Sequence, residues 1–134
     1  MVKLYLDEPY AESVRRWAKE AEVIATSRVA YPEAMSALAR RRRAGDINET
    51  GFKQVRTALR RQWSKFVVLD LDEIGAGSLA VKHGLRGFDA IHLEAALAAR
   101  RHADDVPVTF SSFDDQLNAA AAKEGFEILG AQAL

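Results

Sequence analysis

The sequence contains no cysteine. That absence excludes disulfide bonds, thiolate catalysis and cysteine-based zinc sites. Long apolar runs are also missing, since none approaches the roughly 20 residues that a bilayer-spanning helix requires. The first residues, MVKLYLDEPY, are too acidic and too weakly apolar for a secretory signal. These absences predict a cytoplasmic protein that does not interact with the membrane.

The sequence has no excess of charge of one sign, because 19 Lys and Arg residues are balanced by 19 Asp and Glu residues. This balance argues against bulk electrostatic attraction to nucleic acid, although it leaves room for a local basic patch. With 49% apolar residues, the chain is too hydrophobic to be disordered. Its 134 residues suit one domain. We therefore expect a single domain over residues 1–134.

Apolar residues recur at helical spacing in some segments and form short runs in others. Helices are predicted over residues 10–21, 29–45, 48–63, 72–84, 88–102 and 114–125. Strands are predicted over residues 22–27, 65–71, 106–112 and 126–130. Strands that alternate with helices imply a mostly parallel sheet covered on both faces. The predicted fold class is therefore a three-layer α/β/α domain.

The segment FVVLDLDEIG (66–75) allows two interpretations. A strand that ends in Asp-x-Asp resembles the nucleophile loop of haloacid-dehalogenase-type phosphotransferases. However, Ile74 stands where that family has Thr or Val, and the motif lies too late in the chain. We favour the structural interpretation, in which Asp70 and Asp72 end a strand and cap the next helix.

Three acids follow or face the predicted carboxyl ends of strands, where ligands of open α/β sheets bind: Glu33, Asp89 and Asp114. Carboxylates that converge there repel one another unless a cation neutralises them, and oxygen ligands favour Mg²⁺ or Mn²⁺. Such an ion can activate water against a phosphodiester. The alternative is that Asp89 and Asp114 only cap helices. Glu33 is harder to explain as an ordinary solvent-facing residue, because Ala30 and Ala37 share its helix face.

Four segments carry a resemblance to a known family: VKLYLDEP, EVIATSRVAYPEAMSALAR, LRGFDAIHLEAAL and FSSFDDQLNAAAAKEGF. They occur in the order, and near the spacing, of PIN-domain ribonucleases. The sequence is most similar to the VapC-type toxins of bacterial and archaeal toxin–antitoxin pairs. The resemblance implies a PIN-like α/β domain that hydrolyses RNA as an endoribonuclease dependent on Mg²⁺ or Mn²⁺.

Through this resemblance, Glu33, Asp89 and Asp114 match three of the family's four acidic metal-site positions. Ser112 matches a hydroxyl residue that often lies two positions before the last acid. The resemblance thus implies a catalytic set of three metal ligands and one serine that orients a ligand or water.

Several arginines are candidates for contacts with RNA phosphates. Arg86 is favoured by its position before Asp89, and Arg40 and Arg43 end a predicted helix. The next helix adds Arg56, Arg60 and Arg61. The alternative for the helix-end arginines is a solvated face stabilised by the helix dipole.

The start of the sequence departs from the family pattern. In the family, VKLYLDEP usually follows a short apolar strand that ends in the first catalytic Asp, and here Met1 stands within that link. Three explanations fit: a start codon assigned too far downstream, which we favour; a degenerate relative with a rearranged sheet; or a partner chain that fills the gap. The alternative function is a catalytically impaired PIN-like binding or dimerisation module.

The resemblance also predicts partners. These are an RNA substrate, a cognate antitoxin and a second copy of the chain in a homodimer. We expect the antitoxin to cover the apolar face of residues 2–21 and the arginines.

Overall fold

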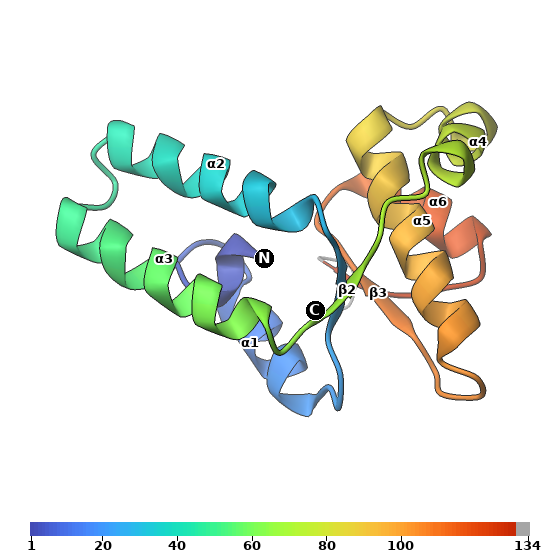
Figure 1. Cartoon of the computed structure of the whole chain (residues 1–134), viewed down its shortest axis with the longest axis horizontal. Helices are drawn as coiled ribbons and strands as arrows, with labels where there is room; N and C mark the ends of the chain where they lie inside the picture. The colour runs from blue at the N-terminus through green and yellow to red at the C-terminus, as the bar shows by residue number, and fades with distance from the viewer. Residues whose placement is uncertain (131–134) are drawn as a thin grey trace. The chain divides into compact units, whose positions relative to one another are not determined.

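The computed structural model describes residues 1–130. In this part of the chain the α-helices are α1 (Ala11–Glu20), α2 (Ala30–Arg43), α3 (Glu49–Trp63), α4 (Glu73–His83), α5 (Gly87–His102) and α6 (Asp115–Lys123), shown in Figure 1. The strands are β1 (Ala25–Ser27), β2 (Val67–Leu69), β3 (Thr109–Ser111) and β4 (Glu127–Leu129). A short 3-10 helix, η1 (Val2–Leu4), precedes them and was not predicted. The predicted α/β class and the order of its elements are confirmed.

Short polar side chains begin three of the helices. Asn48, Asp72 and Asp114 each accept a hydrogen bond from the backbone N–H three residues later, at 2.7, 2.8 and 2.8 Å. Such a bond satisfies one of the amide groups that a helix start leaves without an intrahelical partner. Asp72 is therefore a helix cap, as the structural interpretation of residues 66–75 predicts.

The strands pair two by two. β1 pairs with β2, and β3 pairs with β4 in a parallel arrangement that sets Phe110 opposite Ile128. We predicted one central sheet, whereas the described strands form two separate ladders. Each of the described strands is only three residues long, so both ladders are short.

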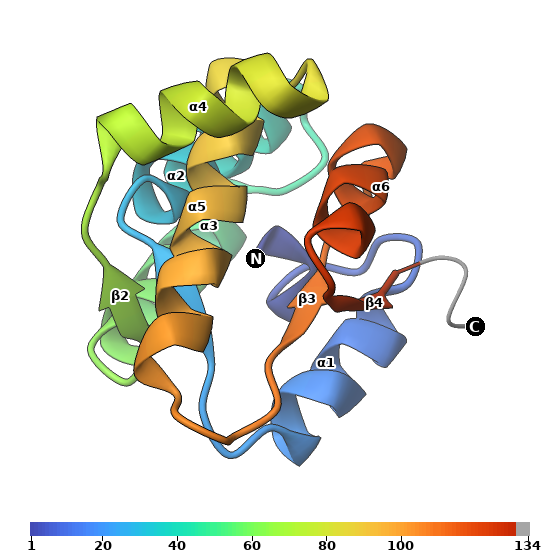
Figure 2. The same ribbon diagram turned by 90° about the vertical axis from the view of Figure 1, so that its right-hand side faces the viewer.

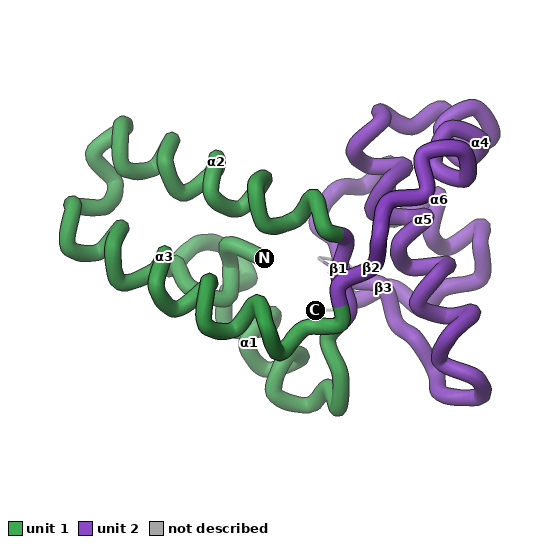
Figure 3. The backbone as a smooth tube through the Cα atoms, in the orientation of Figure 1, with its two compact units in different colours: residues 1–24, 28–67 green, residues 25–27, 68–134 purple. Residues whose placement is uncertain are grey.

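The chain divides into two compact units, coloured separately in Figure 3. Unit 1 holds residues 1–24 and 28–67, and unit 2 holds residues 25–27 and the described residues from 68 onward. Each unit has a hydrophobic core of its own.

The core of unit 1 forms where η1 and the residues after it meet the pair of helices α2 and α3. Leu6, Leu38 and Phe52 are buried there, with Leu38 only 1% exposed. Val2 and Met35 pack against them from the edge. The opening residues of the chain are thus part of this core and not only a surface.

The core of unit 2 is built around α5. Helix α5 packs against α4, β1 and α6, and α6 covers β3 and β4 (Figure 2). Ala90 and Leu93 on α5 are fully buried, and the rings of Phe110 and Phe126 join β3 to the start of β4 at 6.0 Å between centroids. This packing places residues from the start of α5 and the start of α6 in the same hydrophobic core.

The outer face of α4 carries apolar side chains. Ile74 is 78% exposed and Val81 is 88% exposed. Among the described residues, no helix is both long enough and apolar enough to cross a membrane.

Candidate functional site

The first turns of α5 and α6 carry two of the predicted acids, Asp89 and Asp114. Asp114 is the N-cap of α6, and its Oδ1 accepts the Leu117 N–H at 2.8 Å. Asp89 lies in the first turn of α5. Both carboxylates therefore occupy helix N-termini, where the helix dipole favours negative charge.

Arg86 connects these two acids. Its Nε lies 3.4 Å from Oδ2 of Asp89, and its Nη2 lies 3.7 Å from Oδ2 of Asp114. The side chain of Arg86 is 82% exposed, whereas those of Asp89 and Asp114 are 21% and 38% exposed. Two of the three predicted metal ligands are thus brought together within unit 2, around one positive charge.

The backbone beside Arg86 is held in place by α6. Gly84 ends α4 with φ of 64°, a left-handed conformation that glycine adopts without strain. Its carbonyl accepts a hydrogen bond from Gln116 Nε2 at 2.9 Å, and Leu85 is buried in the core. The segment that carries Arg86 is therefore held to α6 through Gly84 and to the core through Leu85.

Ser112 acts on Asp114 through the backbone. Its Oγ accepts the Asp114 N–H at 3.0 Å, and its carbonyl accepts a hydrogen bond from Asn118 Nδ2, also at 3.0 Å. Asn118 is buried, with its Oδ1 unpaired among the described residues. The serine hydroxyl accepts in this contact, so its own proton is left to donate to another group.

Glu33 belongs to unit 1, in the first turn of α2. Ala30 is buried and Ala37 half-buried, as expected for that face, yet the Glu33 side chain is exposed. Burial lowers the pKa of the Met1 ammonium, and the nearby carboxylates of Glu8 and Glu33 partly offset that effect. Glu33 therefore lies within electrostatic range of the chain's amino group.

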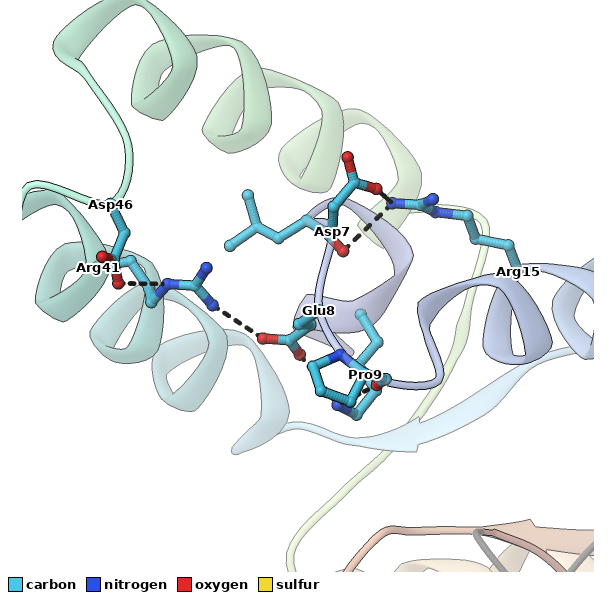
Figure 4. A network of polar contacts seen from close by, with 8 residues as sticks. Asp7, Glu8, Pro9, Arg15, Arg41 and Asp46 are labelled. Carbon is cyan, nitrogen blue, oxygen red and sulfur yellow. Dashed lines mark hydrogen bonds and ion pairs between the residues drawn. The ribbon is translucent and has the colours of Figure 1, made fainter. Parts of the chain in front are cut away.

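The arginines at the end of α2 divide into two classes. Arg41 forms ion pairs with Glu8 at 2.9 Å and with Asp46 at 3.0 Å. Figure 4 shows them together with the Arg15–Asp7 pair. Arg42 stacks over the Phe52 ring at 3.9 Å. These two contacts fasten the chain's opening residues and α3 to α2.

The arginines that the sequence singled out, Arg40 and Arg43, are exposed. The Arg40 side chain donates a hydrogen bond to Ser36 Oγ of the same helix at 3.2 Å. On α3 further cations are exposed: Lys53, Arg56, Arg60 and Arg61. Unit 1 thus presents basic side chains on both helices of the pair.

The donor set in unit 2 suits a hard divalent cation. Asp89 and Asp114 each direct one oxygen, Oδ2, at the same guanidinium, and carboxylate oxygens are what Mg²⁺ and Mn²⁺ prefer. Within either unit, as far as residue 130, no group of three or more His, Asp or Glu side chains gathers closely enough for a metal. Unit 2 alone therefore offers two carboxylates.

Sequence reasoning missed the residues that support this pair. Gln116 and Asn118 hold the loops that carry Arg86 and Ser112, and nothing in the local pattern distinguishes them from ordinary helix residues. Arg86 was predicted only as a contact for RNA phosphates, and its ion pairs with Asp89 and Asp114 were not predicted.

Comparison with known proteins gives two concordant findings. A family model described as "PIN domain" matches residues 1–123. "Ribonuclease VapC45" of Mycobacterium tuberculosis strain CDC 1551 / Oshkosh is 34% identical over 110 residues, which is 80% of this chain and 74% of that protein. "Ribonuclease VapC49" of strain ATCC 25618 / H37Rv matches with the same identity and coverage.

Proposed function

The chain belongs to the PIN-domain family, as a relative of the VapC ribonucleases, and from this premise we propose that it is a metal-dependent endoribonuclease. In this proposal it cleaves RNA as the toxin of a type II toxin–antitoxin pair in the cytoplasm. Its ion is Mg²⁺ or Mn²⁺.

The observation that carries the proposal is the convergence of Asp89 and Asp114 on one positive charge. Each acid contributes its Oδ2, at 3.4 and 3.7 Å from the same guanidinium. Two carboxylates gather a cation in this way because their mutual repulsion must be neutralised. The arrangement supports a place for a divalent ion at the start of α5 and α6.

We assign Glu33, Asp89 and Asp114 as the residues that hold the ion. When bound, such an ion stabilises developing negative charge on a phosphodiester and lowers the pKa of a bound water. Asp114 keeps its Oδ1 on the Leu117 N–H, so its Oδ2 is the atom available to a cation. Ser112 fixes the backbone of Asp114, and its hydroxyl proton can orient a water or a substrate oxygen.

RNA contacts in this proposal come from Arg86 and from the exposed arginines of α2, Arg40 and Arg43. The guanidinium fork matches the geometry of phosphate oxygens. Exposed cations on α3 add further positive charge to unit 1. These contacts would position the backbone of RNA rather than read its bases.

The proposed protein partners are a cognate antitoxin and a second copy of the chain. Leu6 and Ala11 are buried within unit 1. The part of residues 2–21 that remains for an antitoxin therefore centres on side chains such as Tyr10, which is 46% exposed.

A second candidate function is a PIN-like binding or dimerisation module that does not cleave RNA. It is favoured by the ion pairs of Arg86, whose single positive charge already offsets part of the negative charge of Asp89 and Asp114. The two functions differ in whether a divalent ion binds.

Calorimetric titration with Mn²⁺ tests the proposal. The chain is compared with Asp89→Asn and with Asp105→Asn, a matched change of an exposed acid in the loop before β3. Binding that Asp89→Asn abolishes and Asp105→Asn preserves is the expected result. Cleavage of a mixed RNA pool that EDTA stops would then establish the activity. A folded chain that binds no Mn²⁺ would contradict it and favour the binding module.

A further inference from the structure

One guanidinium occupies the position between the two carboxylates of unit 2. Arg86 Nε faces Asp89 Oδ2 at 3.4 Å, and Nη2 faces Asp114 Oδ2 at 3.7 Å. The other oxygen of Asp114 is already used, because Oδ1 caps α6 at 2.8 Å from the Leu117 N–H. The two oxygens that face Arg86 are thus the ones that a divalent ion would take.

These contacts are weak enough to exchange. Both distances exceed the roughly 2.7–2.9 Å of a strong charge-assisted hydrogen bond. The Arg86 side chain is 82% exposed, and exposed ion pairs contribute little because water and salt screen them. Arginine nevertheless stays charged at every physiological pH, so it offsets one of the two negative charges whenever no metal is present.

Only the side chain of Arg86 has to move for the exchange. Its backbone is the N-cap of α5, and the neighbouring Gly84 carbonyl is fixed by Gln116 at 2.9 Å. Leu85, the residue before Arg86, is buried in the core. A displaced guanidinium would therefore remain tethered beside the site, with its donors turned to solvent.

We propose that Arg86 is a resident counter-cation of Asp89 and Asp114, which a divalent ion displaces and which then binds a phosphate group of RNA. The inference rests on the proposed function, since it presupposes that a divalent ion binds these acids. It goes further in making Arg86 a competitor of the metal and a ligand of RNA in turn. Arg86 acts in this way as a positioning residue that couples loading of the ion to binding of RNA.

The test compares two affinities in the chain and in Arg86→Gln. Mn²⁺ affinity is measured by calorimetry without RNA, and RNA affinity is measured with a labelled single strand in Ca²⁺, with EDTA as reference. Loss of the competitor should tighten Mn²⁺ binding about two- to tenfold, which corresponds to one or two exposed ion pairs. The same variant should weaken RNA binding in Ca²⁺. A variant that binds Mn²⁺ more tightly and RNA more weakly than the chain is the result that exchange predicts.

Two further variants control for charge and for geometry. Lys123→Gln removes one exposed positive charge from unit 2 without touching the acids, and should leave Mn²⁺ affinity unchanged. Arg86→Lys keeps the charge but loses the fork that reaches both acids, so its Mn²⁺ affinity should lie between those of the chain and of Arg86→Gln.

The outcomes separate this inference from the proposed function. If the chain binds Mn²⁺ and Arg86→Gln binds it equally or more weakly, Arg86 is a structural ion pair and the exchange is wrong, while the metal site stands. If neither the chain nor Arg86→Gln binds Mn²⁺, the proposed function fails and the exchange fails with it. If only Arg86→Gln binds Mn²⁺, Arg86 blocks the site, and the competition is confirmed in its extreme form.

Discussion

At the scale of single residues, Asp114 combines two tasks that need different atoms. Its Oδ1 caps α6 through the Leu117 N–H, and its Oδ2 faces the shared cation position beside Asp89. An N-cap needs only a short side chain with an acceptor oxygen, whereas a metal ligand needs a negative charge. Substitutions at this position can therefore separate folding from metal binding.

We expect Asp114→Asn and Asp114→Ala to differ in stability and to agree in metal binding. Asn preserves the cap and should leave the free energy of unfolding nearly unchanged, whereas Ala should lower it by about 1 kcal/mol. Both should abolish Mn²⁺ binding, because both remove the charge. Urea unfolding and calorimetry measure the two effects. Mn²⁺ binding that survives in Asp114→Asn would remove this residue from the metal site.

Gly75 is required by a close approach of side chains. A Cβ at this position would lie 2.7 Å from Asp72 Oδ2 and 3.2 Å from the Glu94 carboxyl carbon. Gly77, on the same helix, has no heavy atom within 4 Å of such a Cβ. The two glycines therefore make a matched pair.

Gly75→Ala should lower the free energy of unfolding by about 1–3 kcal/mol, because the crowding outweighs the better helix propensity of alanine. Gly77→Ala should raise it by about 0.5–1 kcal/mol, since only the propensity changes. Chemical denaturation followed by circular dichroism compares them. Equal effects at the two positions would show that Asp72 and Glu94 move aside freely.

At the scale of secondary-structure elements, Glu124 ties the ends of α4 and α6 together. One of its carboxylate oxygens lies 2.6 Å from Lys82 Nζ and 2.7 Å from His83 Nε2. Arg100 Nη1 donates to the backbone carbonyl of the same residue at 2.8 Å. The hydrogen bond from Lys82 lowers the pKa of Glu124 below its usual value of 4.5, with a further contribution from His83.

This shift makes the tie between α4 and α6 sensitive to acid. The unfolded chain takes up a proton at Glu124 at higher pH than the folded chain, so the stabilisation is complete above pH 4.5 and is lost as the pH falls through the folded pKa. The difference in Tm between the chain and Glu124→Gln should therefore be largest near neutral pH and should close under acid conditions. Thermal scans across this range measure it, with the exposed Glu127→Gln as control. A difference that persists in acid would assign the effect to packing.

At the scale of the whole molecule, local signals were predictable and long-range pairings were not. The caps Asp72 and Asp114 follow from rules that span three residues, and so do the helices that begin there. The pairing of β3 with β4, and of β1 with β2, depends on contacts between distant segments. The expected single sheet was drawn from the alternation of strands with helices, which does not specify which strands pair with one another. We still propose that residues 1–134 form a single domain, which consists of the two compact units.

The candidate site divides in the same way. Asp89, Asp114 and Ser112 could be named from motif and position, and the structure places all three around the start of α5 and α6. The different roles of the arginines from Arg40 to Arg43 could not be predicted from the sequence. Four successive arginines have the same local sequence pattern. Only the positions of Glu8 and Phe52 show that Arg41 and Arg42 are structural.

Metal binding should stabilise the folded chain as a whole. An ion that binds only the folded state at about 100 times its Kd adds about 2.7 kcal/mol to the free energy of unfolding. We expect Mn²⁺ to raise the Tm, EDTA to reverse the rise, and Asp89→Asn to show neither change. Differential scanning calorimetry measures all three. A rise that persists in Asp89→Asn would place the ion elsewhere on the molecule.

The exposed face of α4 has a consequence for how the protein behaves at high concentration. Ile74 and Val81 present apolar surface to solvent, and the formal net charge of the chain at pH 7 is zero. Molecules without net charge do not repel one another, so apolar patches that meet can adhere. Solubility should therefore be lowest near neutral pH. Replacement of Ile74 by Glu should relieve the precipitation, both by removing apolar surface and by giving every molecule a net negative charge.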